Sequence, residues 1–134
     1  VTGVQTCALP IYTLREICKP KASFIACDDS PIQWKEGKTF IFKMYLHGFL
    51  PVGRHTINVV KMDKTSREID TKEYDNTVVI WNHYIKMEEI SQQVTRYTDT
   101  VDLYAGCLTS IAAWWTLKFY KHRQRKWQKI AKSL

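Results

Sequence analysis

Three side chains carry most of the chemistry in this sequence: His83, Asp99 and Arg123. His83 and Asp99 are each the polar member of an otherwise apolar face in two successive alternating segments, and a turn at Ile90–Gln92 would place them directly opposite each other. A carboxylate that orients an imidazole is a general acid–base arrangement. Arg123 lies at the centre of the apolar face of a predicted helix, where it could meet a ligand carboxylate or phosphate bidentately.

The same three residues also fit a purely structural role, because buried charges in proteins are normally paired. A hydrogen-bonded network could fix the helix against the sheet without touching any ligand. Three interpretations therefore stay open: a structural network, a ligand anchor, and a catalytic pair with His83 and Asp99 as candidates.

Aromatic residues recur on the predicted inner faces and could line a cavity between sheet and helix, although such residues also form ordinary cores. They are Phe40, Phe42, Trp81, Tyr97, Trp114, Trp115 and Phe119. The predicted ligand-binding set combines part of this group with the three polar residues. It consists of Trp81, His83, Tyr97, Asp99, Trp115, Phe119 and Arg123.

The sequence predicts no metal site and no cofactor. His47 and His55 flank a turn and could face each other, but two histidines without a third ligand make a poor metal site. The chain has no G-x-S-x-G, no glycine-rich phosphate loop and no H-E-x-x-H.

The net charge of +7 is concentrated in one terminal segment. Residues 103–134 contain seven Lys or Arg and no Asp or Glu, whereas residues 1–102 contain thirteen of each sign. This segment could be a basic interaction module, but cations also suit the C-terminus of a helix, and we favour a solvated face. No nucleic-acid motif is present, so we expect no nucleic-acid partner.

These residues must be positioned by an antiparallel sheet followed by one helix. Alternating apolar residues predict a meander, because the segments follow one another with short turns between them. The expected strands are 21–27, 39–47, 54–62, 66–74, 77–87 and 95–103, with 48–53 as a turn. A helix of about 24 residues, or about 36 Å, should follow Gly106, with its first two turns enclosed by protein. Residues 12–19 should form the end of another helix, stopped by Pro20.

Several blocks in this order resemble the START/polyketide-cyclase-like (SRPBCC) superfamily, in a bacterial branch, over residues 14–130. The blocks are Trp34–Gly37, Gly48–Gly53, Trp81–His83, Thr95–Asp99, Ala105–Thr109 and Phe119–Trp127. The resemblance implies an α+β helix-grip fold, in which a curved antiparallel sheet wraps around a long C-terminal helix. It also implies binding of a hydrophobic small molecule or lipid between sheet and helix. A cyclase- or hydratase-like enzyme using His83 and Asp99 is the alternative. Asn82 stands where the family motif would have Asp.

Residues 1–11 resemble the translation of a widely used short-read sequencing adapter, so we expect an artefact there and a single domain over residues 12–134. Compared with the family, that domain would lack its first strand and part of its first helix. The scattered cysteines Cys18, Cys27 and Cys107 predict reduced thiols and a cytoplasmic protein. No segment is apolar over the length that a membrane span needs.

Overall fold

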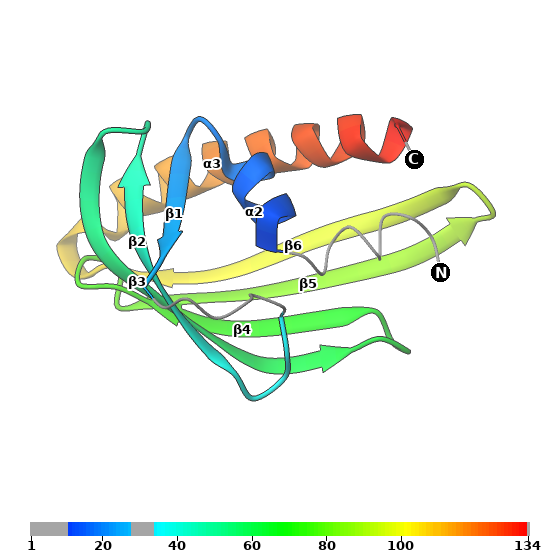
Figure 1. Ribbon diagram of the computed structural model, residues 1–134, viewed down its shortest axis with the longest axis horizontal. Helices are drawn as coiled ribbons and strands as arrows, with labels where there is room; N and C mark the ends of the chain where they lie inside the picture. The colour runs from blue at the N-terminus through cyan, green and yellow to red at the C-terminus, as the bar shows by residue number, and fades with distance from the viewer. Residues whose placement is uncertain (1–10, 28–33, 134) are drawn as a thin grey trace.

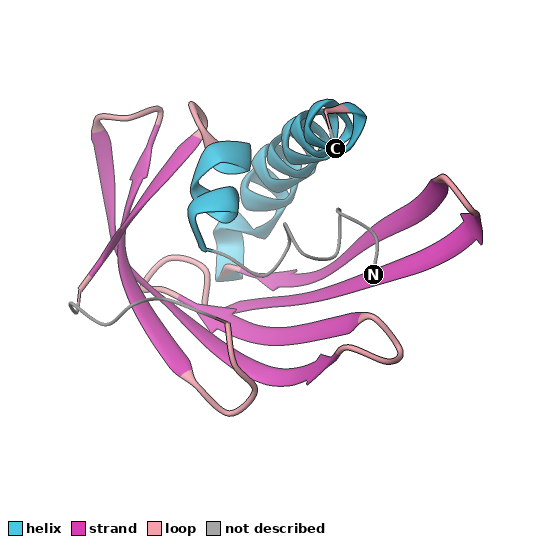
Figure 2. Ribbon diagram, turned by 45° about the vertical axis from the view of Figure 1, so that its right-hand side comes forward, coloured by secondary structure: helices cyan, strands magenta, loops and turns pink. Residues whose placement is uncertain are grey.

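Six antiparallel strands form one strongly curved sheet, and two helices lie on its concave side (Figures 1 and 2). The computed structural model describes residues 11–27 and 34–133. The architecture is therefore α+β, with a long C-terminal helix. The adapter-like segment lies outside the described residues except for Ile11, which begins the first helix that the structure describes.

The strands follow one another across the sheet in chain order, as the predicted meander requires. They are β1 (Ala22–Ala26), β2 (Thr39–Leu46), β3 (Leu50–Asp63), β4 (Glu68–Tyr74), β5 (Ile80–Ser91) and β6 (Val94–Tyr104). Side chains alternate between the two faces of a strand. Phe40, Phe42 and Met44 of β2 are accordingly buried, while the residues between them are exposed.

The predicted turn at 48–53 is wrong, because β3 already begins at Leu50 and Pro51 pairs with Tyr45. The chain reverses earlier, at His47 and Gly48, which both have positive φ angles. A register shift between Met44 and Tyr45 lets the sheet continue past the proline, which cannot donate a backbone hydrogen bond.

The helices are α2 (Ile11–Cys18) and α3 (Thr109–Lys132), with a short 3-10 turn, η1 (Gly106–Leu108), before α3. The length of α3, 24 residues, confirms the prediction. The expected enclosure of its first turns is wrong, since Ile111, Trp114 and Leu117 are 67%, 59% and 58% exposed. Only one side of these turns faces the sheet, and no described strand or helix covers the other.

The main hydrophobic core lies between the helices and the concave face of the sheet. Ile17 and Cys18 of α2 pack there with Phe119 and Trp127 of α3 and with Trp81 of β5. The polar residues predicted to be functional therefore enter the interior from β5, β6 and α3, at the place where the two layers meet.

Candidate functional site

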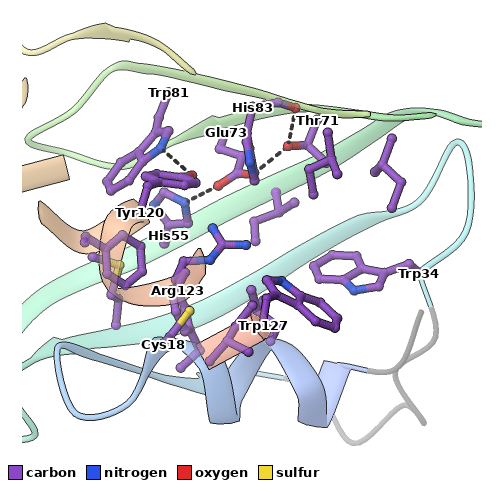
Figure 3. A pocket seen from close by; sticks show the side chains of 18 of the residues that line it. Cys18, Trp34, His55, Thr71, Glu73, Trp81, His83, Tyr120, Arg123 and Trp127 are labelled. Carbon is purple, nitrogen blue, oxygen red and sulfur yellow. Dashed lines mark hydrogen bonds and ion pairs between the residues drawn. The ribbon is translucent and has the colours of Figure 1, made fainter. Parts of the chain in front are cut away.

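A cavity of about 70 Å³ lies between the concave face of the sheet and the two helices (Figure 3). We call it the inner cavity. Most of its wall is aliphatic or aromatic, with Trp81, Phe119 and Trp127 among the lining residues. The described wall also contains two imidazoles, one carboxylate and one guanidinium, which converge from β3, β4, β5 and α3: His55, Glu73, His83 and Arg123. A concave apolar site with a few polar groups is typical of small-molecule binding sites.

A second, larger depression of about 280 Å³ adjoins the inner cavity, and we call it the outer groove. Its wall is almost entirely apolar and includes Val78, Leu108 and Ala112. Met44 and Trp81 line both the inner cavity and the outer groove. These two side chains therefore form part of the wall of both spaces.

His83 and Asp99 form the predicted hydrogen bond, with Nε2 of His83 2.7 Å from Oδ1 of Asp99. The expectation that they lie directly opposite is wrong. His83 pairs with Val101 and Asp99 pairs with Ile85, so the two side chains are diagonal neighbours on one face. Diagonal neighbours remain within reach of long side chains.

The register differs from the prediction because β5 and β6 are longer than expected. The hairpin closes at Ser91 and Val94, with an irregularity between Glu89 and Ser91, rather than through the predicted turn at Ile90–Gln92. His83 lines the inner cavity, while Asp99 lies behind it and lines neither space.

Asp99 is held as a buried carboxylate by several donors. Besides His83, the hydroxyl of Tyr97 donates to Oδ1 at 3.2 Å and Nε2 of Gln124 donates to Oδ2 at 3.1 Å. Burial acts to raise the pKa of Asp99, but the His83 hydrogen bond and the charge of Arg123 outweigh it, so that pKa lies below its usual value. Both oxygens of Asp99 are therefore already engaged.

A second polar cluster, which sequence reasoning missed, joins His55, Glu73 and Asp75. Nε2 of His55 lies 2.9 Å from Glu73 Oε2, and Nδ1 lies 3.1 Å from Asp75 Oδ2. Burial acts to lower the pKa of His55, but the hydrogen bonds to Asp75 and Glu73 prevail and raise it to about 9. His55 is therefore a cation at neutral pH that donates from both ring nitrogens.

The carboxylates of this cluster also have other donors. The Thr71 hydroxyl donates to Glu73 Oε1 at 2.6 Å, and the backbone N–H groups of Thr77 and Val78 donate to Asp75 Oδ1. The signal for this cluster was present in the alternation. His55 precedes the inward-facing Ile57 by two positions, and Glu73 follows Thr71 by two.

His47, which we expected opposite His55, lies instead in the β2–β3 turn, where its side chain is exposed. His55 pairs across the sheet with Phe42. Among the described residues, no group of three or more His, Cys, Asp or Glu could hold a metal ion.

Arg123 is buried on the inner side of α3, as the helical spacing predicted, and is only 5% exposed. Its guanidinium points from α3 into the inner cavity (Figure 3). The guanidinium carbon lies 4.7 Å from the ring centre of Tyr120 and 5.7 Å from that of Phe119. Its Nε has no hydrogen-bond partner, and within the described residues no carboxylate oxygen lies within 4.0 Å of the guanidinium.

The predicted aromatic set is divided by the structure into three groups. Trp81, Tyr97 and Phe119 line the inner cavity, and Trp114 and Trp115 line the outer groove together with Trp81. The two remaining members, Phe40 and Phe42, belong to a separate core cluster and line neither space.

Comparisons with protein-family models, with curated proteins and with solved structures found nothing that matches this chain. The site therefore has to be interpreted from its own geometry.

The described part of the chain contains no helix that is both long enough and apolar enough to cross a membrane. Lys118, Lys121, Arg125, Lys129 and Lys132 of α3 are exposed, and Lys118 stacks over Trp114 at 4.0 Å. Lys126 is half-buried and donates to the backbone carbonyl of Glu16 in α2 at 3.4 Å.

Proposed function

We propose that this chain is a helix-grip protein of the START/polyketide-cyclase-like class that binds an apolar small molecule between its sheet and α3. One observation carries the proposal: the inner cavity and the outer groove adjoin beneath α3, and their walls are aliphatic and aromatic with a few convergent polar groups. Small-molecule sites have this composition.

The sizes of the two spaces indicate how a ligand would lie. The outer groove, at about 280 Å³, is close to the lower end of the roughly 300–1,000 Å³ that small-molecule sites occupy. The inner cavity, at about 70 Å³, is about half the roughly 150 Å³ that accommodates benzene. The apolar body of a ligand therefore fits the outer groove, and only a small headgroup fits the inner cavity.

The exposed apolar residues at the start of α3 support this arrangement. Ile111 and Trp114 both line the outer groove and are more than half exposed. A contiguous apolar patch at the surface is a common feature of ligand-binding grooves and interaction sites. A ligand in the outer groove would cover part of this wall.

The test is a titration with 1-decanol, an uncharged apolar probe, followed by tryptophan fluorescence. All five tryptophans of the chain line the inner cavity or the outer groove, so bound probe should change the emission. Ala112→Phe should fill part of the outer groove and weaken binding of 1-decanol roughly tenfold or more. Ala113, the next residue on α3, is exposed and lines neither space, so Ala113→Phe is the matched control. Equal binding of 1-decanol by both variants would contradict binding in the outer groove.

A second candidate function, general acid–base catalysis, is favoured by the geometry of His83. Asp99 holds its Nε2, while its Nδ1 makes no hydrogen bond among the described residues and lies 3.9 Å from Glu73 Oε1. A ring nitrogen oriented in this way on a cavity wall could exchange a proton with a ligand. Hydration of a crotonyl thioester, followed by absorbance, tests this candidate. Turnover that is lost in His83→Gln would support it, and absence of turnover in the wild type would count against it.

A further inference from the structure

Among the described residues, Arg123 is the one charged side chain of the inner cavity that makes no hydrogen bond and has no carboxylate oxygen within 4.0 Å. It is 95% buried, given its 5% exposure, and its guanidinium projects into the space between α3 and the sheet (Figure 3). Its contacts there are the rings of Tyr120 and Phe119. Its Nε is buried without a hydrogen-bond partner, and an unused donor in an apolar interior is unfavourable.

The nearby carboxylates do not fill this gap. Asp99 attracts Arg123 electrostatically, but its oxygens accept hydrogen bonds from His83, Tyr97 and Gln124. Glu73 is bound by the cationic His55. The carboxylates of Asp99 and Glu73 thus accept hydrogen bonds from other donors, and Arg123 makes no hydrogen bond to either of them.

The arginine is also placed where a ligand headgroup would lie. It lines the inner cavity, which has room for only a few heavy atoms, while the space suited to an apolar body lies beyond Met44 and Trp81. A guanidinium binds a planar carboxylate through two parallel hydrogen bonds. A phosphate would bring further charge and oxygens, and the described lining of the inner cavity contains no lysine and no second unpaired cation to meet them.

We propose that the inner cavity binds the carboxylate of an amphipathic monocarboxylic acid, with Arg123 as the anchoring residue and the apolar tail of the acid in the outer groove. This inference rests on the proposed function and narrows it to one class of ligand. The chain would then prefer an acid to the alcohol of the same length.

Calorimetric titration of the full chain with decanoate and with 1-decanol tests the inference. The two probes share an apolar tail and differ in the headgroup. The wild type should bind decanoate more tightly, and Arg123→Met should weaken decanoate binding by roughly 10- to 100-fold, the range expected for a charge-assisted hydrogen-bonded pair. Binding of 1-decanol should stay within about twofold of its wild-type value, since an alcohol does not need the charge.

Two further variants keep the result interpretable. Arg125→Met removes a charge of the same kind from the exposed side of α3 and should leave the preference for decanoate unchanged. Arg123→Lys retains the charge but not the planar fork. If Arg123→Met does not fold, a several-fold loss for decanoate alone in Arg123→Lys carries the same conclusion.

The outcomes separate this inference from the proposed function. If the wild type binds both probes equally and no substitution of Arg123 changes this, the role of Arg123 as a carboxylate anchor is overturned. Binding of apolar molecules then still stands. Binding of neither probe would overturn both. A loss of thermal stability in Arg123→Met, with the preference for decanoate intact, would assign Arg123 a structural role and overturn the anchor.

Discussion

The buried His55 should make the stability of this protein fall as the solution becomes alkaline. The pKa of His55 is raised from 6.5 to about 9 in the folded chain, because hydrogen bonds to Asp75 and Glu73 outweigh its burial. A group whose folded pKa is raised stabilises the folded state fully below its unfolded pKa, and this stabilisation is lost as pH rises through the folded pKa. The window for His55 therefore runs from about pH 6.5 to about pH 9.

The size of the effect follows from the shift. Each unit of pKa corresponds to about 1.4 kcal/mol, so His55 should contribute about 3 kcal/mol at pH 6.5. Within the window, the free energy of unfolding should fall by up to about 1.4 kcal/mol per pH unit through this residue. That loss is a substantial part of the about 5–15 kcal/mol by which domains are usually stable.

Urea unfolding followed by tryptophan fluorescence at several pH values from 6.5 to 9.5 measures this contribution. The stability advantage of the wild type over His55→Gln should fall by about 3 kcal/mol between pH 6.5 and pH 9.5. His47→Asn is the control, because His47 is exposed in a turn with positive φ, which asparagine tolerates. A difference between wild type and His55→Gln that does not change with pH would refute a charged His55.

Three further predictions concern single residues. Asp99→Asn should lower the free energy of unfolding by about 2 kcal/mol, since it weakens charge-assisted hydrogen bonds, and urea unfolding checks this; no change would mean that the His83 contact contributes nothing. Burial raises the pKa of the Cys18 thiol to about 12, so iodoacetamide should modify the exposed Cys27 long before Cys18 in native protein, as peptide mass spectrometry can show; equal rates would contradict the buried position. Gly53 has a φ of +100°, so Gly53→Ala should lower the free energy of unfolding by about 1–3 kcal/mol and with it the melting temperature. An unchanged melting temperature would contradict this backbone conformation.

Much of the fold follows from alternation in the sequence. The inward positions of β2 and β6, and the length of α3, were all predictable because period-two and helical patterns depend only on nearby residues. Arg123 was placed correctly for the same reason, since helical spacing alone puts it among Phe119, Tyr120 and Trp127.

The rest depended on contacts between distant segments. The hairpin of β5 and β6 closes at Ser91 and Val94 and not through the expected turn at Ile90–Gln92. This changes the register, so His83 and Asp99 meet diagonally. The cluster of His55 with Glu73 was missed because β4 is mostly charged or polar, a composition typical of a solvated strand. The exposed Ile111 shows that an apolar helical turn predicts burial only where a second element covers it.

The central claim is that an apolar molecule binds between the sheet and α3, and the indole N–H resonances of the five tryptophans test it most directly. In a ¹H–¹⁵N spectrum of the full chain titrated with 1-decanol, the account predicts saturable shifts at Trp81, Trp114 and Trp115, which line the outer groove. Ala112→Phe should raise the 1-decanol concentration at half-saturation roughly tenfold or more, and Ala113→Phe should leave it unchanged. A half-saturation point that is unchanged in Ala112→Phe, or no shifts in the wild type, would contradict the claim.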